Sequence, residues 1–288
     1  MLRPTSARRI RRALLSSAVP RRHPGGDEFT KHLAANCSFP AHSLGPILFS
    51  LTMALKLSAS NIICYVTDRA SLLPAPMLGH PIEPRREIVA VSPLAPLLTN
   101  ISAAAAAGVD WIQLREKDLA ARDCAKLTRA ALQLRSASST KILINDRLDV
   151  AIAEQAAGVH LGENSLPIAE VRRLLNSSAE HTSFQFLIGV SCHSVASARA
   201  AASSGAGYIF FGPVFPTPSK AAFGPPQGLL RLAEVCRAVT IPVLAIGGIT
   251  LQNAAACADS GAAGIAAIRL FQESSDLSAV VAQLRSLR

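Results

Sequence analysis

The fold is decided by residues 141–161, which read KILINDRLDVAIAEQAAGVHL. The runs Lys141–Asn145 and Gly158–Leu161 have the apolar character of buried strands, and residues 147–156 between them have helical patterning. Neither run alternates apolar with polar residues, which is typical of parallel strands that are covered on both faces. A helix between two parallel strands carries the chain back to the starting edge of the sheet. This segment therefore predicts a βαβ unit.

The same alternation of strand and helix extends in both directions from this unit. The eight strand candidates are residues 62–67, 109–114, 141–145, 158–161, 186–191, 208–212, 242–246 and 264–268. The eight helix candidates are residues 92–107, 119–137, 147–156, 168–175, 195–204, 229–239, 251–260 and 276–287. Eight such units over about 225 residues predict an α/β fold, a single (β/α)8 TIM barrel. A doubly wound sheet is the alternative, but its glycine-rich G-x-G-x-x-G turn is absent from the sequence.

Several residues mark where the predicted helices begin and end. Asp118 and Thr250 have the short polar side chains that are typical of N-caps. Gly108, Gly205 and Gly261 stand where a glycine commonly closes a helix in a left-handed conformation.

The chain is half hydrophobic and carries a formal net charge of +10, which by itself suggests a nucleic-acid partner. Residues 1–31 hold eight basic and two acidic residues, so more than half of this excess lies in one arm. We expect residues 1–58 to be a disordered basic extension, and residues 59–288 to be the catalytic barrel. A nonfunctional extension is the favoured interpretation, with a transit peptide or a nucleic-acid arm as alternatives. The basic residues lack interleaved aromatics, so we expect no nucleic-acid partner.

Other features of the sequence limit where the chain works. No apolar run reaches the roughly 18–20 residues of a transmembrane helix, and no signal peptide is recognisable, so we expect a cytoplasmic protein with no membrane partner. The six cysteines form no C-x-x-C pair, which predicts reduced core residues and no zinc site. Residues 68–91 are rich in proline and predict an insertion or a lid. Whether copies of the chain form a homo-oligomer is left open.

Polar residues follow the second and third predicted strands, at the end of a barrel where active sites form. Gln113, Arg115 and Lys117 lie on one side of the alternating chain. Two cations and an amide on one side are typical of a polyphosphate site, although a solvated charged loop has the same composition. Asn145 and Asp146 suit a helix cap or a turn, but beside a phosphate Asp146 is a natural ligand for Mg²⁺.

The fourth and fifth strands also end in residues that carry chemistry. His160 lies within an apolar run, which is more typical of a core histidine with satisfied hydrogen bonds than of a base. Ser191 and His193 offer a hydroxyl and an imidazole, and Ser194 is a candidate cap for the next helix.

The last three strands are followed by residues that suit a second anion. The loop after the sixth strand carries Thr217, Ser219 and Lys220 among prolines. Residues 247–248, both glycines, follow the seventh strand, and residues 268–269 follow the eighth; barrels often bind phosphate between these two loops. The sequence thus predicts two anion sites on one face, which favours an enzyme that joins or rearranges phosphorylated small molecules.

These motifs, in this order, resemble the thiamine phosphate synthase and thiazole tautomerase superfamily over residues 61–272. The matching segments are residues 113–117, 145–146, 158–162, 189–194, 212–220 and 246–250. The synthase is favoured because the tautomerase has no diphosphate to hold. The resemblance implies an Mg²⁺-dependent transferase, a thiamine-phosphate diphosphorylase. Such an enzyme joins hydroxymethylpyrimidine diphosphate to thiazole phosphate and releases diphosphate in thiamine biosynthesis.

The resemblance also implies a role for each matching residue. The diphosphate would be held by Arg115, Lys117, Asn145 and Lys220. The pyrimidine ring would be contacted by Gln113 and Ser191, and Mg²⁺ would be bound by Asp146. The thiazole phosphate would be held by Thr217, Ser219, Gly248 and the backbone at Ile268. The candidate catalytic residues are therefore Arg115, Lys117, Ser191, His193 and Lys220.

Two positions depart from the pattern of the synthase. Ser165 stands where the synthase has a second aspartate for Mg²⁺, so Glu163, Asn164 or a water would have to replace that ligand. Arg269 adds a cation beside the expected thiazole phosphate, where many relatives have a small residue. The alternatives are a thiazole tautomerase that acts on carboxythiazole phosphate with His193 as acid and base, another phosphate-binding barrel enzyme, and a non-catalytic relative that binds phosphorylated ligands.

Overall fold

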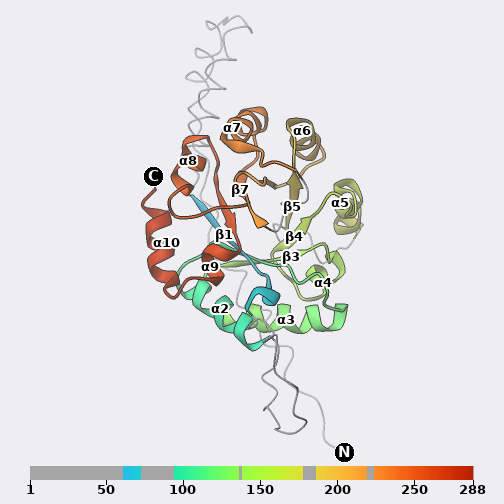
Figure 1. Cartoon of the computed structure of the whole chain (residues 1–288). Helices are drawn as coiled ribbons and strands as arrows, with labels where there is room; N and C mark the ends of the chain where they lie inside the picture. The colour runs from blue at the N-terminus through green and yellow to red at the C-terminus, as the bar shows by residue number, and fades with distance from the viewer. Residues whose placement is uncertain (1–60, 73–93, 136–137, 178–185, 219–223, 288) are drawn as a thin grey trace, which may run out of the picture. The chain divides into compact units, whose positions relative to one another are not determined.

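The computed structural model describes residues 61–72, 94–135, 138–177, 186–218 and 224–287. Its eight strands are all parallel and close into a barrel in the order β1 to β8, with β8 paired to β1 (Figure 1). The strands are β1 (Ile62–Val66), β2 (Trp111–Leu114), β3 (Lys141–Asn145), β4 (Gly158–Leu161), β5 (Leu187–Cys192), β6 (Tyr208–Phe211), β7 (Val243–Ile246) and β8 (Gly264–Ala267). The predicted (β/α)8 barrel is confirmed.

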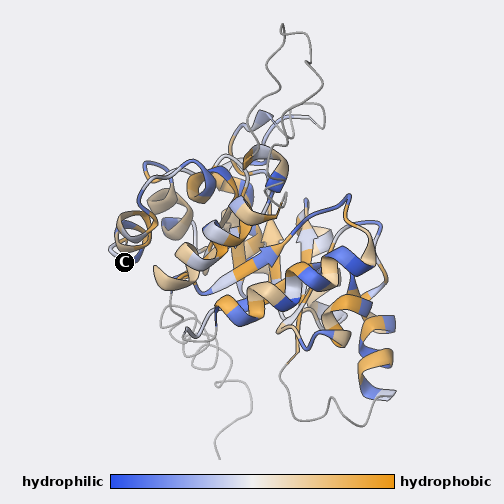
Figure 2. Ribbon diagram, turned by 90° about the horizontal axis from the view of Figure 1, so that it is seen from below, coloured by the Kyte–Doolittle hydropathy of each residue, from blue (hydrophilic) through white to orange (hydrophobic). Residues whose placement is uncertain are grey.

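Helices surround this barrel on the outside (Figure 1). They are α2 (Ala95–Ala106), α3 (Ala121–Leu134), α4 (Leu148–Ala153), α5 (Ile168–Ser177), α6 (Val195–Ser203), α7 (Gly228–Ala238), α8 (Ala254–Asp259) and α10 (Leu277–Arg285). Two short helices, the 3-10 helix η1 (Arg69–Leu72) and α9 (Arg269–Gln272), instead follow the carboxyl ends of β1 and β8. Figure 2 shows hydrophobic residues in the central strands and a mixture of hydrophobic and hydrophilic residues along the helices. Such helices bury one face against the sheet and expose the other. None of the described helices is long and apolar enough to span a membrane.

The three glycines predicted to close helices are confirmed, whereas both predicted N-caps are wrong. Gly108, Gly205 and Gly261 each follow a helix with a positive φ, of 87°, 92° and 89°. Asp118 does not cap α3, whose N-cap is Ala120, because its carboxylate pairs with Arg69 instead. Thr250 does not cap α8, because a turn separates them and Asn253 takes the N-cap position.

Two apolar layers hold the barrel together. The outer layer lies between strands and helices, and the inner layer fills the barrel with alternate strand residues, among them Trp111, Tyr208 and Phe210. The cysteines of the described residues are all free and buried, as predicted: Cys64, Cys124, Cys192, Cys236 and Cys257. The predicted extension at 1–58 and most of the proline-rich segment 68–91 lie outside the described residues.

Candidate active site

A layer of polar side chains lies inside the barrel at the carboxyl ends of four neighbouring strands. It continues the inward-facing alternation of β2, β3, β4 and β5, and its members are Gln113, Asn145, His160 and Ser191. The amide Nε2 of Gln113 donates to Oδ1 of Asn145 at 2.9 Å. The register of the barrel therefore gathers four polar residues that are far apart in the sequence.

His160 is buried and bonded through both ring nitrogens. Nδ1 lies 3.1 Å from the hydroxyl of Tyr208, and Nε2 lies 2.9 Å from Oγ of Ser191. Burial lowers the pKa of His160 to about 3, while the charge of Asp146 raises it and that of Arg115 lowers it further. The imidazole is therefore neutral at pH 7. The prediction of a core histidine with satisfied hydrogen bonds is confirmed.

Tyr208 reaches His160 because the strand between them carries a glycine. A Cβ atom at Gly189 would lie 2.0 Å from the ring of Tyr208, so a larger residue would displace that ring. The ring of Tyr208 also packs on Trp111, with the two centroids 4.7 Å apart. Burial raises the pKa of the Tyr208 phenol well above its usual value, which keeps it uncharged. The neutral ring of Tyr208 thus holds the neutral ring of His160, which in turn contacts the hydroxyl of Ser191.

Asp146 lies on the loop after β3 in a left-handed backbone conformation, with φ of 59°. Aspartate is one of the few residues besides glycine that adopt this conformation readily. One oxygen of its carboxylate accepts hydrogen bonds from the backbone N–H of Gly162 at 3.2 Å and from the hydroxyl of Ser165. The other oxygen accepts a hydrogen bond from the side-chain amide of Asn145 at 2.9 Å. The carboxylate is therefore held in one orientation next to the polar layer.

The oxygen atoms around Asp146 fit Mg²⁺ when a substrate supplies further ligands. Among the described residues, no cluster of three or more His, Cys, Asp or Glu side chains could hold a metal ion. Mg²⁺, however, is commonly bound by one or two carboxylates together with waters and substrate phosphates. Ser165, rather than Glu163 or Asn164, is the side chain of the following loop that contacts Asp146. The chain thus offers one carboxylate and one hydroxyl.

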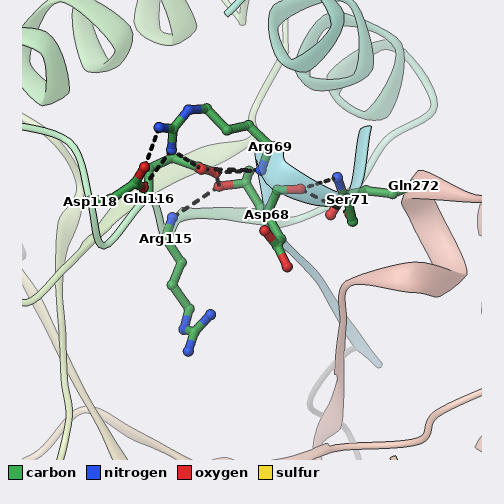
Figure 3. Close-up of polar contacts among 8 residues, drawn as sticks. Asp68, Arg69, Ser71, Arg115, Glu116, Asp118 and Gln272 are labelled. Atoms are coloured by element: carbon green, nitrogen blue, oxygen red, sulfur yellow. Dashed lines mark hydrogen bonds and ion pairs between the residues drawn. The ribbon is translucent and has the colours of Figure 1, made fainter. Parts of the chain in front are cut away.

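The segment after β2 supplies positive charge to the same mouth. The backbone N–H of Arg115 donates to Oγ1 of Thr67 at 2.9 Å, which fixes the main chain at this point. Figure 3 shows the guanidinium of Arg115 extending away from Glu116 and Asp118. Arg115 lies two residues after Gln113 of the polar layer, directly after the carboxyl end of β2. Lys117 is exposed two residues further along the chain.

His193 follows β5 and has a defined proton position. Its Nδ1 lies 2.5 Å from the carbonyl oxygen of Gly212. A carbonyl can only accept, so Nδ1 carries the proton and the neutral ring has an unprotonated Nε2. Ser194 caps α6 through the backbone N–H of Ser197 at 3.0 Å, as predicted.

The loops after β6, β7 and β8 form the other side of the mouth. Oγ1 of Thr217 lies 3.4 Å from Nη2 of Arg269, which begins α9 directly after Ile268. A cavity of about 330 Å³ borders Thr217 and is lined mostly by prolines of the same loop. Ser219 and Lys220 lie outside the described residues, so their roles stay predictions.

Gly248 brings two of these loops into contact. Its φ is 67°, and a Cβ atom there would lie 2.5 Å from the carbonyl oxygen of Pro216. The loop that carries Thr217 therefore packs directly on the turn after β7. A glycine is required for both the conformation and the close approach.

Comparison with known proteins identifies the family. A family model described as thiamine monophosphate synthase matches residues 88–271 of the chain. The chain belongs to the thiamine monophosphate synthase family. It is 48% identical over 172 residues to a putative thiamine-phosphate synthase of Geobacter sulfurreducens, covering 60% of this chain and 78% of the relative. It is 44% identical over 182 residues to a thiamine-phosphate synthase of Methanoculleus marisnigri, covering 63% and 83%.

One solved structure agrees with the assignment to the thiamine monophosphate synthase family, and another shares the fold. The thiamine phosphate pyrophosphorylase of Pyrococcus furiosus matches with a TM-score of 0.63 and 28% identity, over 80% of this chain and 96% of that one. The (S)-3-O-geranylgeranylglyceryl phosphate synthase of Thermoplasma acidophilum matches with a TM-score of 0.54 at 16% identity, over 82% and 96%. The second likeness shows the fold alone.

Two features of this family member were not predicted from the sequence. One is the contact between Tyr208 and His160, which depends on the register of β4, β5 and β6. The other is Arg69, whose guanidinium pairs with Glu116 at 3.0 Å and with Asp118 at 2.5 Å. The available signal was the alternation of charge in residues 115–118, which places both carboxylates opposite Arg115 and Lys117.

Proposed function

We propose that this chain is a thiamine-phosphate synthase. It joins hydroxymethylpyrimidine diphosphate to thiazole phosphate and releases diphosphate. The observation that carries the proposal is the composition of the barrel mouth, which is cationic beside a held carboxylate on one side and glycine-lined beside Thr217 and Arg269 on the other. Two such regions at one mouth suit two phosphorylated substrates. Small phosphorylated molecules, rather than nucleic acid, are the proposed partners, and a cytoplasmic location stays a prediction.

The first step of the proposed reaction is the departure of diphosphate. The bond between the pyrimidine methylene carbon and the diphosphate oxygen breaks, and the electron pair leaves with the oxygen. Arg115, Lys117, Lys220 and the amide of Asn145 are proposed to hold the diphosphate as its negative charge grows. Cations and donors that are already in place stabilise that charge more strongly than they stabilise the bound substrate.

Mg²⁺, when bound with the diphosphate, supplies further positive charge to the leaving group. Asp146 is the residue proposed to hold it, through a carboxylate whose orientation Asn145, Gly162 and Ser165 determine. No other step of the proposal depends on the metal.

The second step is the capture of the pyrimidine cation by the ring nitrogen of the thiazole. The nitrogen lone pair forms the new bond, so the step requires no proton transfer. Gln113 and Ser191 are proposed to hold the pyrimidine ring, and Ser191 rests on His160. Because His160 is buried and uncharged, it does not oppose a positive charge above it.

Thr217, Ser219, Gly248 and the backbone at Ile268 are proposed to hold the phosphate of the thiazole. Arg269 lies beside Thr217 and adds a charged donor to this group. Holding both substrates in contact removes much of the entropic cost of their encounter.

The test is formation of thiamine phosphate by the purified full-length chain from the two substrates and Mg²⁺. We expect product from the wild-type chain, and a loss of about 100-fold or more in kcat/KM in Arg115→Gln. Arg129→Gln is the matched control, because Arg129 pairs with Glu154 at 2.5 Å on the outer helices. A wild-type chain that binds thiazole phosphate and forms no product would refute the proposal.

A thiazole tautomerase is the second candidate, and the geometry of His193 favours it. The contact of Nδ1 with Gly212 leaves Nε2 as the ring nitrogen that is free to exchange a proton with a substrate. A tautomerase would isomerise carboxythiazole phosphate without Mg²⁺, and His193→Ala would abolish that reaction. Isomerisation that survives in His193→Ala would remove this candidate.

A further inference from the structure

The segment that begins the cationic side of the mouth alternates in charge. Residues 115–118 read Arg-Glu-Lys-Asp and carry no net charge. Carboxylates this close in the sequence could pair with the neighbouring cations and weaken their attraction for a diphosphate. A partner that holds these carboxylates away from the neighbouring cations would therefore strengthen the binding of an anion.

Arg69, the first residue of η1, takes up both carboxylates. Its Nη1 lies 3.0 Å from Oε2 of Glu116 and 2.6 Å from Oδ1 of Asp118, and its Nη2 lies 2.5 Å from Oδ2 of Asp118 (Figure 3). Its backbone N–H also donates to both carboxylate oxygens of Glu116, at 3.2 and 3.1 Å. The side chain of Glu116 is only 3% exposed, so this pairing compensates a nearly buried charge.

Thr67 ties the same cluster to the main chain of Arg115. Its hydroxyl donates to Oε1 of Glu116 at 2.6 Å and accepts the backbone N–H of Arg115 at 2.9 Å. Thr67 is fully buried at the end of β1. From the other side, the amide of Gln272 on α9 donates to the carbonyl oxygen of Asp68 at 2.8 Å. The turn that bears Arg69 is therefore held at two points.

The guanidinium of Arg115 points away from this cluster (Figure 3). In the part of the chain that the structure describes, the ion pairs of Glu116 and Asp118 are made with Arg69 and not with Arg115. The hydrogen bonds from Arg69 also lower the pKa of Asp118, because a guanidinium favours the charged form of a carboxylate that it contacts.

We propose that Arg69 is a positioning residue of the diphosphate site, which holds Glu116 and Asp118 on the far side of the chain so that Arg115 meets the diphosphate without a competing carboxylate. This inference rests on the proposed function. Arg69 itself touches no substrate. Its removal lowers the local charge of residues 69 and 115–118 from +1 to 0, and removal of one carboxylate restores it.

The test measures binding of inorganic diphosphate by calorimetry to the full-length chain in the presence of Mg²⁺. We expect Arg69→Gln to weaken binding about tenfold, and the double variant Arg69→Gln/Asp118→Asn to recover most of that loss. Arg129→Gln, which breaks the pair with Glu154 far from the mouth, should bind like the wild type. The KM for thiazole phosphate should stay within about twofold in all three variants.

The outcomes of this test distinguish failure of the proposed role of Arg69 from failure of the proposed function. Equal binding by Arg69→Gln and the wild type would overturn the role of Arg69 and leave the proposed function standing. A loss that Asp118→Asn does not recover, accompanied by a higher KM for thiazole phosphate, would show a general structural role and overturn the inference. A wild-type chain that binds no diphosphate would overturn both. Thermal unfolding of each variant checks that it is folded.

Discussion

The Nε2 atom of His160 and the Oγ atom of Ser191 lie 2.9 Å apart, on neighbouring strands inside the barrel mouth. The other ring nitrogen is taken by the hydroxyl of Tyr208, so His160 is bonded on both sides and cannot turn. A buried neutral histidine in this position orients a hydroxyl without adding charge.

Acid should destabilise the fold through His160. Its pKa is about 3 in the folded chain and ordinarily 6.5, so between these values the unfolded chain binds more protons. The free energy of unfolding therefore falls as the pH drops from 6.5 toward 3, by as much as about 4 kcal/mol. Urea unfolding across this range measures the change. His160→Gln should lose much of the slope; an unchanged slope in that variant would contradict the buried neutral state.

Gly189 should be intolerant of any side chain. A Cβ atom there would lie 2.0 Å from the ring of Tyr208, so Gly189→Ala should cost more than about 3 kcal/mol of unfolding free energy. Gly207→Ala is the matched control, because its nearest neighbour would be 3.6 Å away and it should change stability by less than about 1 kcal/mol. Equal effects of the two substitutions in denaturant unfolding would contradict the packing described for Tyr208.

Gly248→Ala should act on one substrate only. The added Cβ atom would lie 2.5 Å from the carbonyl oxygen of Pro216 and would displace it, together with the loop that carries Thr217. We expect the KM for thiazole phosphate to rise about tenfold and the KM for the pyrimidine diphosphate to stay nearly unchanged. Gly108→Ala, which also places a side chain at a positive φ, here 87°, but meets nothing within 4 Å, should change neither KM. A rise in both values for Gly248→Ala would argue against a separate thiazole phosphate site.

Ser165→Asp should strengthen metal binding. It adds a second carboxylate beside Asp146, in place of a hydroxyl that donates to it. Titration with Mn²⁺ by electron paramagnetic resonance, without substrate, should show about tenfold tighter binding than in the wild type. Ser165→Ala is the control and should bind no more tightly than the wild type. No gain in Ser165→Asp would mean that Asp146 is not a metal ligand.

Local patterns in the sequence were enough to predict the strands. The bounds of β3 and β4 agree with the prediction, and each apolar run is followed directly by a residue that the barrel does not fully bury, Asp146 or Gly162. The start of α8 was predicted three residues early, since the turn formed by Thr250 and Asn253 reads like the first turn of a helix. Propensity alone does not separate these two structures.

Long-range pairing was the part that the sequence could not supply. Gln113, Asn145 and Ser191 were predicted at the mouth because strand ends converge in a barrel. The partners of His160 lie 31 and 48 residues away, and Glu116 lies 47 residues from Arg69, so each contact depends on strand register. The alternation of charge in residues 115–118 does not predict which cation forms an ion pair with which carboxylate.

The most direct test of the account is the stoichiometry of the complete reaction. Purified wild-type chain is mixed with hydroxymethylpyrimidine diphosphate, thiazole phosphate and Mg²⁺, and both products are quantified over time. Two anion sites at one barrel mouth predict equal amounts of thiamine phosphate and diphosphate in the complete reaction, and no thiamine phosphate when thiazole phosphate is omitted. Binding of both substrates with no thiamine phosphate formed would contradict the account.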